Sequence, residues 1–246
     1  MPEIHETTDY EKFKFYPCNR TIYEGHVEKL CNDPGFPKAF PHDPMIVNEN
    51  FYVIDGQHRR LAAERLGIPC YYTIKHGATE KDIIPLQNSK KWTYDDFIHF
   101  HVTNGNEEFM FIKEMIDKYK ISAHVIVSIC RSFSTNNTRR GVNITLFRQG
   151  VINNLNKEST RDLCSKLFPE LNEIKRINPK KRHLWGTVYI ESFCSIYKWD
   201  SVVFDRILNK LVEFHTFLPV EIHEHRAKEN LMAILNKRKA YNQTKF

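Results

Sequence analysis

Residues 55–60, with the sequence Asp-Gly-Gln-His-Arg-Arg, carry residue types whose spacing suggests chemistry. They follow the β-prone residues 52–54 and precede apolar residues at helical spacing, so the hydrophobic period changes from two to 3.6 across Gly56. The first N–H groups of a helix lack backbone partners and carry the positive end of its dipole. Because two arginines lie in that first turn, the junction predicts a site that stabilises a phosphate.

The motif's polar side chains each allow two interpretations. Asp55, a candidate catalytic residue, could bind a metal or act as a base, whereas we favour a helix cap that accepts backbone N–H groups. His58, the second catalytic candidate, could transfer a proton or only shape the loop. Arg59 has a guanidinium that matches phosphate geometry, although an ion pair with Glu64 or Asp55 would give the same sequence.

The elements that must position this motif form a small mixed α/β unit. Strands are expected at residues 13–17, 45–47, 51–54 and 70–74, and helices at residues 24–31 and from Gln57 onward. Residues 32–44 contain repeated prolines, which cannot continue a strand or a helix. We interpret them as a long loop bordering the site.

From Trp92 onward, proline and glycine thin out and helical patterns dominate. The polar residues 87–91 therefore predict a boundary between a domain at residues 1–90 and a helical domain at residues 91–246. The predicted fold class is α+β, with the small mixed α/β domain followed by an all-helical region.

Residues 107–133 contain two amphipathic stretches joined by a short break, with Ser122 placed to cap the second. This pattern is typical of a helix-turn-helix, whose second helix enters the DNA major groove. The exposed face of that helix would offer His124, Ser128 and Arg131 to DNA. A helical hairpin built for core packing fits the pattern too.

Several strings together resemble the N-terminal domain of the ParB and sulfiredoxin superfamily, including phage-type ParB-like proteins. The resemblance covers about residues 15–90, and its Asp-Gly-Gln-His-Arg string is also similar to that of DGQHR proteins linked to DNA modification. It rests on residues 19–22 (Asn-Arg-Thr-Ile), 26–30, 44–47, 54–59 and 62–67.

This resemblance implies a fold that binds a nucleoside triphosphate, which is CTP in ParB proteins and closes a clamp on DNA. A helix-turn-helix follows the nucleotide domain in that family, and residues 107–133 occupy the corresponding place. CTP or ATP, with Mg²⁺ as a further candidate, is the expected cofactor. The residues assigned to the nucleotide are Arg20, Gly56, Gln57, His58, Arg59 and Arg60.

The chain also departs from both relatives. Sulfiredoxins place a cysteine where this chain has Gln57, which offers no thiolate, so we expect no sulfiredoxin activity. ParB proteins carry an acidic residue that helps to hold the metal in the segment that matches residues 84–88, and here Gln87 is kept without a carboxylate. Magnesium binding and hydrolysis are therefore less well supported than nucleotide binding.

The composition suits a polyanionic partner without requiring one. The chain has 246 residues, with 36 Lys and Arg against 30 Asp and Glu, for a formal net charge of +6. Basic clusters could contact DNA phosphates, and they could equally be solvated faces. The candidate DNA-binding residues combine the second helix of residues 107–133 with these basic clusters. They are His124, Ser128, Arg131, Arg139, Arg140, Lys180, Lys181 and Arg182.

The remaining reactive residue types are interpreted as structural. The six cysteines are scattered without a CxxC pair, which favours reduced, buried thiols. The histidines at 99 and 101, and the group at residues 221–225, match no hydrolytic metal motif. Since the chain shows no signal-peptide pattern and no apolar run of membrane-spanning length, we expect a cytoplasmic protein with no membrane partner.

The leading hypothesis is a ParB-like, DNA-associated protein in which a nucleoside triphosphate at residues 55–60 regulates DNA binding. An enzyme using the same pocket, as a nuclease, an NTPase or a small-molecule kinase, is the alternative. The third hypothesis is an interaction protein that binds no nucleotide. The last helices would suit a homodimer interface or packing within one chain.

Overall fold

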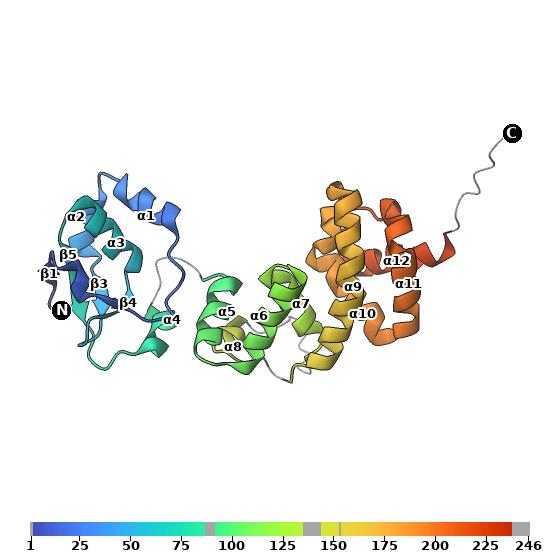
Figure 1. Ribbon diagram of the computed structural model, residues 1–246, viewed down its shortest axis with the longest axis horizontal. Helices are drawn as coiled ribbons and strands as arrows, with labels where there is room; N and C mark the ends of the chain where they lie inside the picture. The colour runs from blue at the N-terminus through green and yellow to red at the C-terminus, as the bar shows by residue number, and fades with distance from the viewer. Residues whose placement is uncertain (1, 87–91, 135–143, 153, 238–246) are drawn as a thin grey trace. The chain divides into compact units, whose positions relative to one another are not determined.

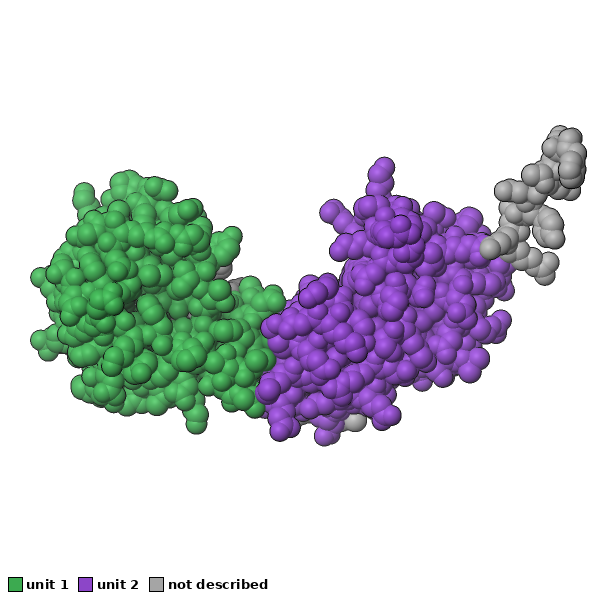
Figure 2. Space-filling view, in the orientation of Figure 1, with its two compact units in different colours: residues 1–106 green, residues 107–246 purple. Residues whose placement is uncertain are grey.

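The computed structural model describes residues 2–86, 92–134, 144–152 and 154–237. The chain forms two compact units, residues 1–106 (unit 1) and residues 107–246 (unit 2), coloured separately in Figure 2. The fold is α+β, as the sequence predicts, with a mixed sheet and helices in unit 1 and a largely helical unit 2 (Figure 1). The predicted boundary at residues 87–91 lies outside the described residues, and helix α5 (Tyr94–Thr103) belongs to unit 1.

Unit 1 is built on a five-stranded sheet in the order β1-β5-β3-β4-β2. The central strand β3 runs antiparallel to β4 and parallel to β5, while β1 pairs antiparallel with β5 and β2 parallel with β4. The sequence did not predict the edge strand β1. The strands are β1 (His5–Thr7), β2 (Lys14–Phe15), β3 (Met45–Val47), β4 (Tyr52–Asp55) and β5 (Cys70–Ile74).

The two longer helices at the start of unit 1, α1 (Glu24–Cys31) and α3 (Gln57–Leu66), pack against each other, and both begin where the sequence predicts. The proline-rich segment differs from the predicted loop. It contains two helical turns, α2 (Phe36–Ala39) and η2 (Phe40–His42), each with a proline in its first turn. A proline costs little there, because its missing N–H would have no helical partner.

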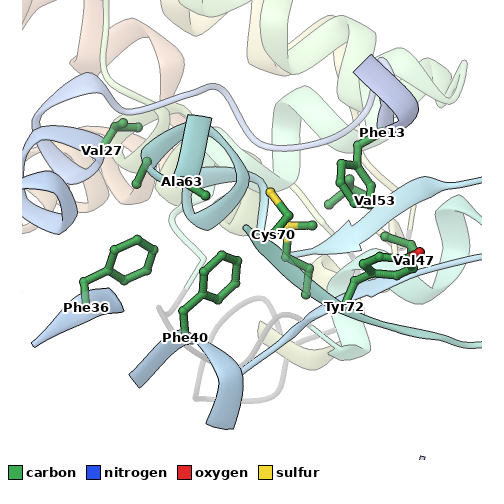
Figure 3. Packing of buried hydrophobic residues seen from close by; sticks show 11 residues of the cluster. Phe13, Val27, Phe36, Phe40, Val47, Val53, Ala63, Cys70 and Tyr72 are labelled. Atoms are coloured by element: carbon green, nitrogen blue, oxygen red, sulfur yellow. The ribbon is translucent and has the colours of Figure 1, made fainter. Parts of the chain in front are cut away.

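Strand β4, which leads into the motif, is covered on both faces. Successive side chains of a strand point to opposite faces, and here Val53 and Ile54 are both fully buried. Val53 packs in a core that also holds Phe40 (Figure 3), whereas Ile54 packs in a second cluster that includes Phe100 of α5. The second cluster explains why α5 belongs to unit 1.

In unit 2, α10 packs against α7, α11 and α12, and α7, whose side chains are mostly buried, also packs against α6. None of the helices in the described part of the chain is long and apolar enough to cross a membrane. The helices of unit 2 are α6 (Glu107–Tyr119), α7 (Ala123–Ser132), α8 (Ile144–Arg148), α9 (Lys157–Ile177), η4 (Pro179–Trp185), α10 (Thr187–Trp199), α11 (Ser201–Phe214), η5 (His215–Phe217), α12 (Glu224–Ala233) and η6 (Ile234–Asn236).

Candidate functional site

Gly56 makes the turn between β4 and α3, and glycine is required there for two reasons. Its φ is +100°, a backbone conformation that residues with a side chain rarely adopt. A Cβ at this position would also lie 2.7 Å from Cγ of Met45, which is fully buried in β3. The turn therefore brings the start of α3 close to the centre of the sheet.

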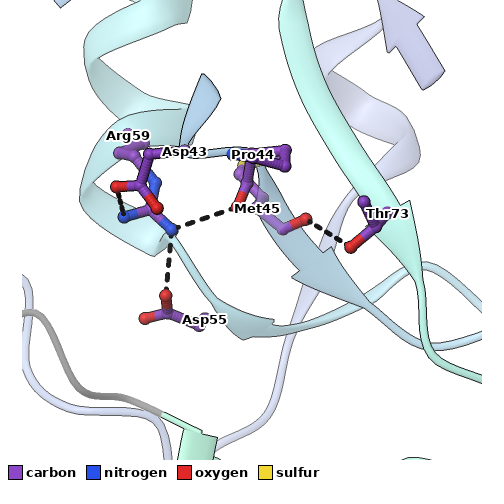
Figure 4. Close-up of polar contacts among 6 residues, drawn as sticks. All are labelled: Asp43, Pro44, Met45, Asp55, Arg59 and Thr73. Carbon is purple, nitrogen blue, oxygen red and sulfur yellow. Dashed lines mark hydrogen bonds and ion pairs between the residues drawn. The ribbon is translucent and has the colours of Figure 1, made fainter. Parts of the chain in front are cut away.

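Arg59 forms an ion-pair network inside unit 1 (Figure 4). Its Nη1 lies 2.8 Å from Asp43 Oδ2, and its Nη2 lies 2.9 Å from Asp55 Oδ2 and 3.3 Å from the Pro44 carbonyl oxygen. The side chains of Arg59 and Asp55 are only 11% and 13% exposed, whereas that of Asp43 is 72% exposed. The sequence left open whether Arg59 forms an ion pair with Asp55. The structure shows that pair, and the Arg59 guanidinium is mostly buried.

Asp55 does not cap α3, contrary to the role that we favoured from the sequence. The N-cap residue of α3 is Gly56, and no side-chain capping bond is formed there within the described residues. The Asp55 carboxylate instead accepts a hydrogen bond from Nη2 of Arg59. The sequence interpretation failed because it considered the nearby N–H groups and did not weigh a charged donor one helical turn ahead.

Arg60 and Gln57 also point into the fold. Arg60 donates to Glu64 and to the carbonyl oxygen of Tyr10, and it is 7% exposed. Gln57 is 3% exposed, and its Nε2 donates to the carbonyl oxygen of Arg20 at 2.8 Å. These two side chains fasten α3 to the preceding chain, and neither lines a pocket among those that the structure describes.

A pocket of about 430 Å³ lies beside the motif, entirely within unit 1. Three helices begin at its wall: Tyr23 is the N-cap of α1, Thr93 is the N-cap of α5, and His58 is the second residue of α3. Each helix start adds the positive end of a dipole. The lining residues are Arg20, Thr21, Ile22, Tyr23, His26, His58, Thr93, Asp95, Asp96 and His99.

Of the residues that the sequence assigns to the nucleotide, Arg20 and His58 line this pocket. Arg20 is 9% exposed, and its guanidinium carbon lies 5.7 Å from the centre of the Trp92 ring, in a cation–π geometry. A buried arginine held at an aromatic ring beside three helix starts gives this wall a positive character. That environment suits an anionic ligand.

His58 contacts the start of α1 directly. Its Nε2 accepts a hydrogen bond from the backbone N–H of Tyr23 at 3.1 Å, and its ring meets His26 edge-on with the ring centres 5.0 Å apart. A ring nitrogen that accepts carries no proton, so this geometry assigns the proton of neutral His58 to Nδ1. His26 was not among the sequence candidates. Only its spacing from Arg20 at the start of a helix could have indicated it.

The start of α5 adds two carboxylates that were not among the candidate residues predicted from the sequence. Asp96 closes a capping box, because its Oδ2 accepts from the Thr93 backbone N–H at 2.8 Å while Thr93 Oγ1 accepts from the Asp96 N–H at 3.3 Å. Asp95 lies beside it in the first turn. The pocket therefore combines cationic and acidic walls.

The candidate recognition helix in unit 2 is the buried helix α7. Ser128 is 2% exposed, so its hydroxyl cannot reach a DNA base in this conformation. Arg131 lies 3.8 Å from Glu191, and His124 is exposed. The burial of α7 fits the helical hairpin built for packing, and the helix-turn-helix at residues 107–133 stays a prediction.

The other candidate DNA-binding residues lie in two separate segments of the chain. Arg139 and Arg140 lie outside the described residues. On η4, Lys180 and Arg182 are exposed, whereas Lys181 Nζ donates to the carbonyl oxygens of Thr216 and Leu218 at 3.0 and 2.9 Å. Two of the three η4 cations are thus open to solvent.

The described residues contain no group of three or more His, Cys, Asp or Glu that could hold a metal ion. His99 contacts the carbonyl oxygen of Pro17 through Nε2 at 3.1 Å, and His101 is buried. All six cysteines are free, and burial raises the pKa of Cys164 and Cys194 to about 12. Those two thiols stay protonated and unreactive at neutral pH.

No model of a known protein family matches this chain, and no curated protein is detectably similar to it in sequence.

Proposed function

We propose that unit 1 binds a nucleoside triphosphate, with the phosphates in the pocket beside the motif, and that the bound nucleotide regulates DNA binding by unit 2. The observation that carries this proposal is the convergence of three helix starts with Arg20 and His58 on one pocket of about 430 Å³. Phosphates are stabilised by helix N-termini and by arginine. The proposed kinship with ParB proteins rests on the motif residues alone.

The proposal differs from the sequence hypothesis in its ligand residues. Arg59 and Arg60 are held in internal ion pairs, and we assign them to positioning α3. Arg20, His26 and His58 are the side chains that we assign to the phosphates. Gly56 and Gln57 act indirectly, since one forms the turn and the other ties α3 to the Arg20 backbone.

Isothermal titration calorimetry with CTP, ATP and GTP, with and without Mg²⁺, tests this assignment. We expect one nucleotide to bind, and we expect Arg20→Ala to weaken its binding by about tenfold or more, the loss typical of a charge-assisted hydrogen bond. Arg65→Ala, on the exposed face of α3, is the matched control. Absence of binding by the wild-type chain, or equal weakening by both variants, would falsify the assignment.

A nucleoside triphosphatase is the second candidate, because the pocket contains Asp95. Magnesium at a nucleotide is held by one or two carboxylates together with the phosphates. Asp96 is engaged in the α5 capping box, which leaves Asp95 as the carboxylate that fits this role. Release of nucleoside diphosphate by the wild-type chain, and its loss in Asp95→Asn, would identify turnover.

A further inference from the structure

The segment before α12 exposes three large apolar side chains. Phe217, Val220 and Ile222 are 58%, 71% and 79% exposed, whereas Leu218 between them is fully buried. We call residues 217–222 the apolar loop. Single exposed apolar residues are common on protein surfaces, but three of them on one short loop indicate an interaction site.

Side chains of η4 and α10 donate hydrogen bonds to the backbone at the start of this loop. Lys181 Nζ donates to the carbonyl oxygens of Thr216 and Leu218, and Tyr189 Oη donates to that of Pro219 at 2.8 Å. With Leu218 inserted into the core, these bonds fix the backbone of residues 216–219, immediately before Val220 and Ile222. The exposed side chains therefore extend from an ordered segment, which lowers the entropy that is lost on binding.

Two cations, Lys181 and Lys237, contact the apolar loop, and two more lie beside Lys181 on η4. Lys180 and Arg182 are exposed on η4, on either side of the Lys181 that holds the loop, and Lys237 Nζ lies 4.3 Å from the ring centre of Phe217. Residues 174–190 contain five Lys and Arg and no Asp or Glu. The partner of this surface is expected to be polyanionic and to have an apolar interior.

We propose that this surface binds duplex DNA, with Lys180 and Arg182 on the phosphates and the tips of Val220 and Ile222 inserted at a base step. Apolar wedges of this kind partly unstack the bases and bend the duplex. The inference rests on the proposed DNA binding of unit 2, and it names a mode of binding that does not use α7.

An anionic lipid surface is the other polyanion with an apolar interior. Glu221 precedes Ile222, and Glu224, which is exposed, follows it by two residues. Insertion of the loop into a bilayer would bring both carboxylates towards anionic headgroups, where their approach is unfavourable. A base step admits only one or two side-chain tips, and Asn230 Nδ2 of α12 donates to Glu221 Oε1 at 2.9 Å, which holds that carboxylate on the protein, so the charges favour DNA.

The test uses the full-length chain and a mixed-sequence duplex that contains 2-aminopurine, whose fluorescence rises when bases unstack. We expect the wild-type chain to raise that fluorescence. Ile222→Ser and Val220→Ser are each expected to remove the rise and to weaken binding by about tenfold, the factor for losing the burial of one aliphatic side chain. Val202→Ser, which changes a 66% exposed valine on α11, is the matched control and should leave both signals unchanged.

The outcomes separate this inference from the proposed function. If the wild-type chain binds no duplex at any salt concentration, the proposed DNA binding fails, and this inference fails with it. If it binds without a rise in fluorescence, or if Ile222→Ser binds as the wild type does, only the wedge is overturned. Sedimentation with phosphatidylserine vesicles that is lost in Ile222→Ser, while DNA binding is kept, would assign the loop to membranes instead.

Discussion

At the scale of single residues, the residues that the sequence assigns to the nucleotide separate into side chains that line the pocket and side chains that hold the fold. Arg20 and His58 line the pocket, while Gln57, Arg59 and Arg60 are turned into unit 1. The sequence string alone could not make this distinction, because burial of a polar side chain depends on partners far along the chain. Substitutions in the motif should therefore divide into effects on binding and effects on stability.

Gly56→Ala is expected to lower the free energy of unfolding by about 3 kcal/mol, from a strained φ together with overpacking against Met45. Gly67→Ala is the control, because Gly67 also has a positive φ of +64° but has no atom within 4 Å of an added Cβ. We expect about 1 kcal/mol for it. Urea unfolding of both variants would measure the difference, and equal losses would contradict the close approach to Met45.

The two carboxylates on Arg59 should differ in their contribution. Asp55→Ala leaves a mostly buried guanidinium without its most buried partner, and we expect a loss of about 3 kcal/mol of unfolding free energy. Asp43→Ala removes an acceptor that is 72% exposed, so we expect less than about 1 kcal/mol. Chemical denaturation of the two variants checks the order, which would be reversed if Asp43 were the main partner.

In unit 2, Asp162 predicts a pH dependence of stability. Tyr197 Oη donates to its Oδ2 at 2.7 Å, and this bond, with a smaller effect of Lys166, lowers the pKa of Asp162 below its ordinary value. A lowered folded-state pKa contributes stability above the unfolded-state pKa, and the contribution is lost as the pH falls through the folded-state pKa. It should therefore be present at neutral pH and absent in strong acid.

Asp162→Asn is expected to lower the unfolding free energy by about 1 kcal/mol at neutral pH, and by much less near pH 2. Urea unfolding at the two pH values measures this. Asp117→Asn, which changes an exposed carboxylate paired with Lys113, is the control for general charge effects. A loss for Asp162→Asn that is the same at both pH values would rule out the ionised carboxylate as its cause.

At the scale of elements, helix α9 contains Pro169 in its interior. Proline removes an N–H donor and crowds the preceding turn, and it is about 3 kcal/mol less favourable than alanine inside a helix. Pro169 is exposed, so its replacement disturbs no core packing. We expect Pro169→Ala to raise the unfolding free energy by about 2 kcal/mol, since the freer unfolded chain offsets part of the gain. A destabilised Pro169→Ala variant would contradict this.

Elements with strong local patterns were predictable, and elements set by distant partners were not. Helix α1 and strands β3 and β5 have the bounds that the hydrophobic spacing predicts. The edge strand β1 was missed because only pairing with β5 defines it. Its three residues carry too little apolar pattern to be recognised alone.

The candidate site was predictable only in part, for a similar reason. The glycine turn and the helix start are local features, and the sequence located both. The wall formed by α5 was not foreseen, because α5 joins unit 1 through a buried cluster around Ile54 rather than through any motif. The sequence left the burial of α7 open between two interpretations, since an amphipathic pattern does not reveal that a helix is surrounded.

At the scale of the whole molecule, the excess of cations predicts salt-dependent DNA binding. Each phosphate contact lowers the slope of log affinity against log salt by about one unit. We expect Lys180→Ala and Arg182→Ala each to reduce the steepness of that dependence by about one unit. Lys113→Ala, which removes a cation paired with Asp117 elsewhere in unit 2, should leave the slope unchanged. Anisotropy titrations across a salt series would show whether η4 contacts phosphates.

The position of Trp92 has an optical consequence. Of the three tryptophans, Trp92 alone belongs to unit 1, and its indole lies against the Arg20 guanidinium at the pocket wall. Its Nε1–H is buried without a hydrogen-bond partner among the described residues, an environment that shifts indole emission to shorter wavelength. Replacement of Trp185 and Trp199 by phenylalanine would leave a chain whose ultraviolet emission reports on this one wall, without any added dye.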